Sequence, residues 1–148
     1  MSLSNIFNIA ATGMSAQSIR LNTISSNIAN AETVSSSIDE TYRARHPVFS
    51  VLKEKQLDGS SEFPIWDNSI NAGYGVEVKG IVESDAPLPR RYEPFHPEAD
   101  EDGYVTYPNV NIVEEMANMI SASRSFQTNV DILESAKGMM QRILTLGK

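Results

Sequence analysis

An acidic segment in the second half of the chain carries the residue types of a calcium site. It runs from Glu98 to Gly103 as EADEDG, and alternating carboxylates followed by a glycine are typical of calcium-binding loops. The position that should supply a closing bidentate glutamate is Asn109, and Pro97 prevents a helix from leading directly into the loop. We therefore expect a solvated acidic turn and no bound metal.

The two histidines are the other side chains that could bind a metal or transfer a proton. His46 and His96 each stand beside a proline and are far apart in the sequence, which does not favour a shared site. The chain has no cysteine and contains no glycine-rich phosphate loop, nucleophile elbow or HExxH pattern. We expect no catalytic residue, no cofactor and no small-molecule ligand. A hydrolase built on serine, histidine and aspartate would need a pocket containing one of the histidines.

The overall charge narrows the range of partners. With 148 residues and a net charge of −7, the chain offers no basic patch to neutralise the phosphates of a nucleic acid. No stretch approaches the ~20 apolar residues that a membrane-spanning helix needs, so we expect no membrane insertion. The first residues lack the basic start and apolar core of a cleaved signal peptide.

A seven-residue repeat organises residues 108–148. The apolar residues follow alternating steps of four and three, which predicts a long helix packed along one seam. This row comprises Ile112, Met116, Met119, Phe126, Val130, Leu133, Met140 and Leu144. Only Ser123 and Lys137 interrupt it, and Asn111 is placed to cap the first turn. The methionines at 116, 119, 139 and 140 could also line an adaptable binding groove, although their spacing favours packing in the seam.

Residues 3–31 repeat this pattern at the other end of the chain. The row comprises Leu3, Phe7, Ala10, Met14, Gln17, Leu21, Ile24, Ile28 and Ala31. Arg20 is the only charged side chain here, whereas a helix with a solvent-exposed face normally carries charges on it. We expect a helix of weak intrinsic propensity that is packed on several sides when folded. Asn27 and Asn30 have two open interpretations, since their amides could cap the helix end or bind a neighbouring subunit.

The middle of the chain predicts a small β-rich module. Alternation in 73–83 predicts a half-buried strand, with Val76, Val78 and Val82 on one face. Further strands are expected within 42–52, at 90–92 and at 104–107, and 53–72 is expected to be a loop or an irregular hairpin.

The expected fold class is therefore α+β. Long N- and C-terminal helices would pair antiparallel in a coiled-coil-like layer, with the β module inserted between them. We divide the chain into an N-terminal assembly helix (1–31), a connecting segment with the β module (32–107) and a C-terminal assembly helix (108–148). Two such helices present more apolar surface than so small a module can cover, so we expect other chains to bury the remainder.

Several stretches of the chain resemble the bacterial flagellar rod and hook proteins. Residues 26–31 (SNIANA) are similar to the N-terminal signature of that family, and residues 123–129 (SRSFQTN) to its C-terminal signature. Within the family, residues 92–100 (YEPFHPEAD), 103–105, 108–110 and 145–148 resemble the proximal rod type. The connection from Thr33 to Tyr42 lacks the glycine-containing turn of most members, and its length also favours the proximal rod type.

This resemblance implies a structural subunit of the basal-body rod, the shaft that transmits motor torque to hook and filament. The implied partners are other copies of the chain, other rod proteins and, in transit, the flagellar type III export apparatus. The implied location is the periplasmic rod, reached without signal-peptide cleavage. The expected subunit-interface residues are Leu3, Phe7, Met14, Leu21, Ile24, Asn27, Ile28, Asn30, Met116, Met119, Arg124, Phe126, Asn129, Val130, Leu133, Met140 and Leu144. The alternative is a soluble adaptor or chaperone-like binding module of an export system.

Overall fold

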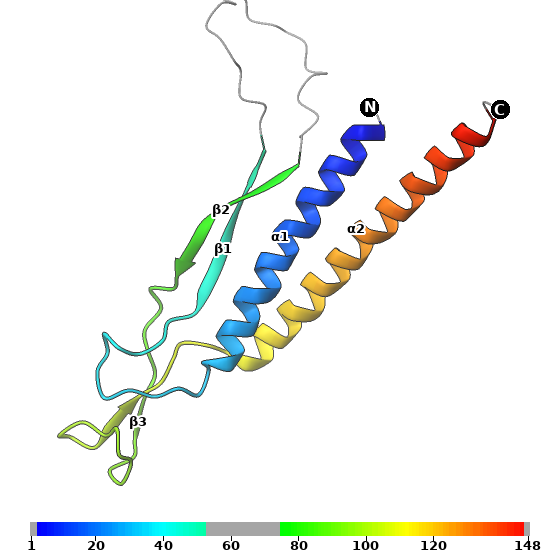
Figure 1. The fold of residues 1–148 in the computed structure, drawn as a ribbon. Coiled ribbons are helices and arrows are strands. Elements are labelled where there is room, and N and C mark those ends of the chain that lie inside the picture. Colours follow the sequence, from blue (N-terminus) through cyan, green and yellow to red (C-terminus); the bar gives the residue numbers. More distant parts are fainter. Residues whose placement is uncertain (1–2, 53–74, 147–148) are drawn as a thin grey trace, which may run out of the picture.

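A computed structural model describes residues 3–52 and 75–146 of the chain. Two long helices run antiparallel, so that the N- and C-termini lie at the same end of the molecule (Figure 1). The elements in order are α1 (Leu3–Ala29), β1 (Arg45–Val51), β2 (Val76–Glu83), β3 (Arg90–Tyr92), β4 (Tyr104–Thr106) and α2 (Ile112–Leu146). The predicted α+β fold class, with two terminal helices packed together and small sheets between them in sequence, is confirmed.

The helix α1 is the middle layer of the molecule. It contacts α2 on one side and the antiparallel ribbon of β1 and β2 on the other (Figure 1). Among the described helices and strands, α2 contacts α1 alone. The near absence of charge from α1 therefore has a structural reason, because this helix has neighbours on two faces. A second small ribbon, β3 with β4, lies near the end of the molecule where α1 ends and α2 begins.

The contact between the helices is built on small side chains. Ala10, Ala122 and Ala136 are buried, and a Cβ on Gly13 would lie 3.0 Å from Nδ2 of Asn129. Small residues allow two helix backbones to approach closely, as they do wherever close helix packing is required. Part of the helix contact therefore cannot be recognised from the sequence, because alanine and asparagine do not stand out in a repeat of large apolar residues.

The predicted seam of α2 was only partly correct for the contact with α1. Three predicted members, Met119, Phe126 and Leu133, are half-buried, as expected. The other row of this contact, however, lies one residue before the predicted positions and comprises Glu115, Ala122, Asn129 and Ala136. Met116 is instead 54% exposed. The breaks that we noted at Ser123 and Lys137 have the same cause, since both residues are exposed and lie beside the buried row.

The strand predicted within 73–83 is confirmed as β2, but its burial was wrong. Val76, Ile81 and Val82 are all exposed, and only Val78 is half-buried. Val48 pairs with Gly80, but the next residue, Phe49, pairs with Val78. Lys79 is therefore an extra residue that forms a bulge in β2. Because a bulge reverses the alternation of faces, Ile81 rather than Val82 shares a face with Val76 and Val78. The strands predicted at 90–92 and 104–107 are confirmed as β3 and β4.

Strand β1 accommodates Pro47 because a two-stranded ribbon has only edge strands. The prediction for 53–72 lies outside the described residues. At the near end of β2, Gly75 has a φ of 136°, a conformation that side-chain-bearing residues rarely adopt. Its backbone passes directly over Thr12 of α1, whose hydroxyl accepts a hydrogen bond from the Val76 amide at 3.3 Å.

Replacing Gly75 with alanine is expected to loosen the ribbon from α1. A Cβ at this position would lie 2.3 Å from Oγ1 of Thr12, and the backbone strain alone is worth about 1–3 kcal/mol. Hydrogen exchange of the Val76 amide should become faster while exchange in the middle of α2 stays unchanged. Gly80→Ala is the matched control, because a Cβ there meets nothing within 4 Å. Equal protection of Val76 in both variants would contradict this account.

Candidate assembly site

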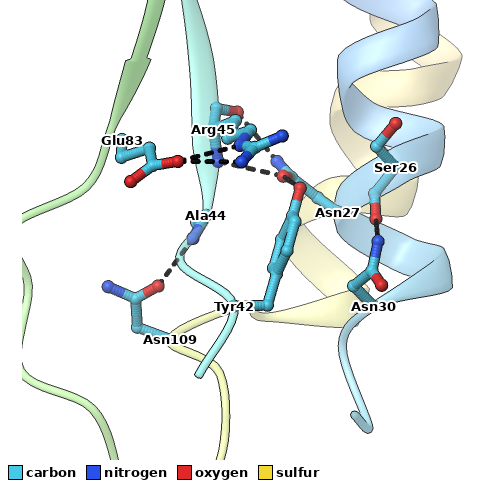
Figure 2. Close-up of polar contacts among 8 residues, drawn as sticks. All are labelled: Ser26, Asn27, Asn30, Tyr42, Ala44, Arg45, Glu83 and Asn109. Atoms are coloured by element: carbon cyan, nitrogen blue, oxygen red, sulfur yellow. Dashed lines mark hydrogen bonds and ion pairs between the residues drawn. The ribbon is translucent and has the colours of Figure 1, made fainter. Parts of the chain in front are cut away.

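The side chain of Asn27 joins three elements at the end of the helix pair. Its Oδ1 accepts hydrogen bonds from the Arg45 amide and the Tyr42 hydroxyl, each at 2.9 Å. Its Nδ2 donates to the Arg45 carbonyl at 2.9 Å and to Oε2 of Glu115 at 3.0 Å. Figure 2 shows Asn27 reaching from α1 toward the start of β1, with Tyr42 beside it. Asn27 is completely buried, so its amide fixes α1 to β1 and to α2.

This arrangement corrects what we expected of Asn27. An amide group has two donor hydrogens and one oxygen acceptor, and all of these are used within the protomer. The amide therefore bonds across the protomer instead of capping the helix end, and contact of Asn27 with a neighbouring subunit stays a prediction. Glu115 is 5% exposed, and the Asn27 amide is the hydrogen-bond donor to its buried carboxylate. Burial also raises the pKa of the Tyr42 phenol, an effect that the Arg45 guanidinium partly opposes.

Two further asparagines fix the chain at the same end. Asn30 Nδ2 donates a hydrogen bond to the Ser26 carbonyl at 2.8 Å. Asn30 therefore caps a carbonyl group in the last turn of its own helix, as one of the two interpretations predicted. Asn109 accepts from the Ala44 amide at 2.8 Å and donates to the Ala86 carbonyl at 2.9 Å; Figure 2 shows the first of these contacts. Sequence reasoning missed the structural roles of Asn109, Tyr42 and Glu115, because each bonds across a separation that no local pattern reveals.

The acidic segment forms a tight turn between β3 and β4. Oδ1 of Asp100 accepts from the amides of Tyr104 at 2.8 Å and Asp102 at 3.1 Å, and Oδ2 pairs with Arg90. Gly103 adopts a φ of 78° there. The central carboxylate of the suspected metal site, Asp100, therefore has protein partners. In residues 3–52 and 75–146, no group of three histidines or acidic residues is arranged to hold a metal ion.

The turn should weaken at low pH. The hydrogen bond from the Tyr104 amide, followed by the interaction with Arg90, holds the pKa of Asp100 below its usual value of 3.8. A lowered folded-state pKa stabilises the turn above the unfolded pKa, and this stabilisation is lost as the pH falls through the folded pKa. The Tyr104 amide resonance should therefore shift with pH below about 3.8. In Asp100→Asn this transition should be absent, and its persistence would assign it to another carboxylate.

The expected interface residues lie at different depths in the protomer. Ile24 and Asn27 are buried; Phe7, Met14, Leu21, Ile28, Asn30, Met119, Phe126, Asn129, Val130 and Leu133 are half-buried; Met116, Arg124, Met140 and Leu144 are exposed. Leu3 begins α1, and its side chain lies outside the description. Both histidines lie apart from this set, His46 on β1 and His96 in the turn after β3.

Helix α2 exposes further large apolar side chains that the repeat did not single out. Val113 is 77% exposed and Ile120 is 56% exposed, and Ile132, Met139 and Ile143 are exposed as well. Exposure of so many large apolar side chains on one helix is typical of a surface that another protein covers. None of the helices described here has the length and apolarity needed to cross a membrane.

An elongated helix pair that leaves many large apolar side chains of α2 exposed defines a protein built for assembly, and comparison with known proteins specifies which assembly. A family model described as "Flagella basal body rod protein" matches residues 7–34, and one described as "Flagellar basal body rod FlgEFG protein C-terminal" matches residues 101–146. These segments contain most of the two helices. The fold and the matches together place the chain among the structural proteins of the flagellar axis.

Full-length relatives narrow this assignment. The chain is 44% identical to the flagellar basal-body rod protein FlgC of Salmonella typhimurium and 45% identical to that of Escherichia coli O6:H1, in each case over 100% of both chains. It is 38% identical to FlgC of Borreliella burgdorferi, over 99% of this chain and 98% of that protein. The chain belongs to the FlgC family of flagellar basal-body rod proteins. It is a structural rod subunit that assembles with other basal-body components, and it is not an enzyme.

Proposed function

We propose that this subunit forms the proximal part of the rod, where it packs with copies of itself and with other rod proteins to transmit motor torque. The observation that carries the proposal is the set of large apolar side chains that α2 leaves exposed. Met116, Ile120 and Ile132 are large apolar residues on a helix that contacts α1 alone among the described elements. Burying such side chains stabilises an assembly by about 1.5–3 kcal/mol each.

The proposed interface combines predicted residues with those found in the structure. Met116, Arg124, Met140 and Leu144 are accessible to a neighbour, and so are the exposed apolar residues Val113, Ile120, Met139 and Ile143. Half-buried residues of the seam, such as Leu21 and Phe126, would contribute their exposed edges. Under this proposal residues 1–31 and 108–148 are the assembly helices, and residues 32–107 form the outer module of each subunit.

We further propose that the chain crosses the inner membrane through the flagellar type III export apparatus and occupies the periplasmic rod without losing a signal peptide. The composition of α1 supports this route. Arg20 is its only charged residue, and Gly13 together with many Ser and Asn residues gives it a low intrinsic helix propensity. A segment of this composition does not form a stable helix before its tertiary contacts form.

The test is the content of isolated hook-basal bodies from a strain whose own gene is replaced by an epitope-tagged copy. The tagged chain should be present in them, and its N-terminal peptide should be intact by mass spectrometry. It should also be present in basal bodies from a strain that cannot add the distal rod subunit, because a proximal subunit is incorporated earlier. A chain found only as a soluble oligomer would favour the adaptor alternative, and a chain lost with the distal subunit would contradict the proximal position.

A further inference from the structure

A groove lies at the end of the molecule where α2 begins. It has a volume of about 590 Å³, and its walls include Glu32, Arg91, Ile112 and Val113. Arg91 is held over the ring of Tyr107 at 4.4 Å from the ring centroid, which forms one firm wall. Ile112 is 37% exposed and Val113 is 77% exposed. We call the residues that line this groove (31, 32, 89, 91, 107, 108 and 110–113) the base.

The opposite end of the molecule has a complementary shape and polarity. The contacts between Gly13 and Asn129 and between Asn27 and Glu115 set the antiparallel register, and this register places Leu3, the first residue of α1, across from Met139. The last turns of α2 therefore project beyond α1. Their side chains Met140, Ile143 and Leu144 are exposed. We call residues 139–146 the tip.

The two ends also differ in charge. The groove residues belong to two segments, 30–43 and 84–115, which together contain eleven acidic and three basic side chains. The tip end has no acidic residue after Glu134, and Lys137 and Arg142 lie on that part of α2. Neighbouring α1 contributes no charged side chain until Arg20. A base within acidic segments and an apolar, basic tip are electrostatically complementary, which orients association.

We propose that the base groove receives the tip of the next rod subunit, so that subunits of this fold stack head to tail along the rod. The occupant is the projecting end of a C-terminal helix, apolar on its sides and flanked by lysine and arginine, as in this chain. A contact between two different patches of the molecule does not close on itself and therefore propagates along an axis. This inference rests on the proposed rod function and adds the surface through which axial neighbours meet.

A photo-crosslinking amino acid at Val113 of the full chain tests the contact in assembled rods. Basal bodies would be isolated after irradiation, and crosslinked peptides identified by mass spectrometry. The expected partner peptide is the C-terminal helix end of a rod subunit, residues 137–148 for a second copy of this chain. The same probe at Lys79, an exposed residue of β2, is the matched control and should not capture that peptide. If the Val113 variant does not enter basal bodies, Glu32 on the groove wall provides a second probe position.

Single substitutions at the tip sharpen the test. With the probe at Val113, Leu144→Asp should lower the yield of the tip crosslink at least tenfold, because it places a charge where apolar burial is expected. Thr145→Asp adds the same charge at the neighbouring exposed residue and should reduce the yield less. Capture of a helix middle or a β module, or no capture from chains present in basal bodies, would overturn the docking inference and leave the rod function intact. Absence of the unsubstituted chain from basal bodies would instead remove the rod function.

Discussion

Asn27→Ala is expected to lower the free energy of unfolding by about 3–5 kcal/mol. The substitution removes four hydrogen bonds and leaves the Glu115 carboxylate, the Arg45 peptide groups and the Tyr42 hydroxyl without their partner. Each buried polar group left unsatisfied costs about 1–3 kcal/mol, and an uncompensated buried charge costs more. Urea denaturation followed by circular dichroism would measure the loss. Asn22→Ala, at an exposed position of the same helix, should change stability by no more than about 0.5 kcal/mol.

A double-mutant cycle separates the donor hydrogens of Asn27 from its shape. Asn27→Asp keeps the size of the side chain but places an oxygen 3.0 Å from the Glu115 carboxylate, so it should be nearly as harmful as alanine. Glu115→Gln restores a donor to that contact and should recover part of the lost stability in the double variant. If the two substitutions are additive, the contact between Asn27 and Glu115 does not contribute in the way that the geometry indicates.

The second large effect is expected from Met116→Asp, which should abolish rod incorporation and swimming while the protomer remains folded. Met116 is 54% exposed, so a carboxylate there stays hydrated in the free chain. In an assembly that covers this side of α2, the same carboxylate would be buried without a partner, at a cost of several kcal/mol. Immunoblots of isolated basal bodies and swimming in soft agar would measure the result.

Two comparisons make this result interpretable. Lys79→Asp introduces a carboxylate at an exposed position of β2, outside the two assembly helices, and should leave incorporation intact. Phe126→Asp should also abolish incorporation, but by unfolding the helix pair, because Phe126 is half-buried against α1. Export of all three variants can be followed in the culture medium. Normal swimming of the Met116→Asp strain would show that this side of α2 is not an interface.

The sequence predicted the two helices well because their seven-residue repeat is long and uninterrupted by proline. It predicted only half of the helix contact, because Ala122 and Asn129 carry no hydrophobic signal although they occupy the seam with Phe126 and Leu133. The prediction instead chose Met116 and Val130, each one residue after a member of the observed contact row, Glu115 and Asn129. Apolar periodicity records every surface that is buried in the final assembly, and it does not distinguish contacts within a protomer from contacts between protomers.

The junction around Asn27 was beyond the reach of sequence reasoning for a different reason. Its partners Tyr42, Arg45 and Glu115 come from three separate segments, and hydrogen bonds over such separations leave no local pattern. The face of β2 was mispredicted because one bulge opposite Val48 and Phe49 reverses the alternation. An extra residue in a strand looks like ordinary sequence until its partner strand is known.

The position of α1 between α2 and the β1–β2 ribbon has a mechanical consequence. Because α2 contacts no other described helix or strand, a load applied to α2 reaches the ribbon through α1, like a force carried by springs connected in series. The compliances of such springs add, so the softer of the two contacts limits the stiffness of the whole subunit. The close approach at Gly13, the Thr12 hydroxyl bond to Val76 and the bonds of Asn27 to Arg45 and Glu115 are therefore the joints whose rigidity limits how far each subunit deforms under load.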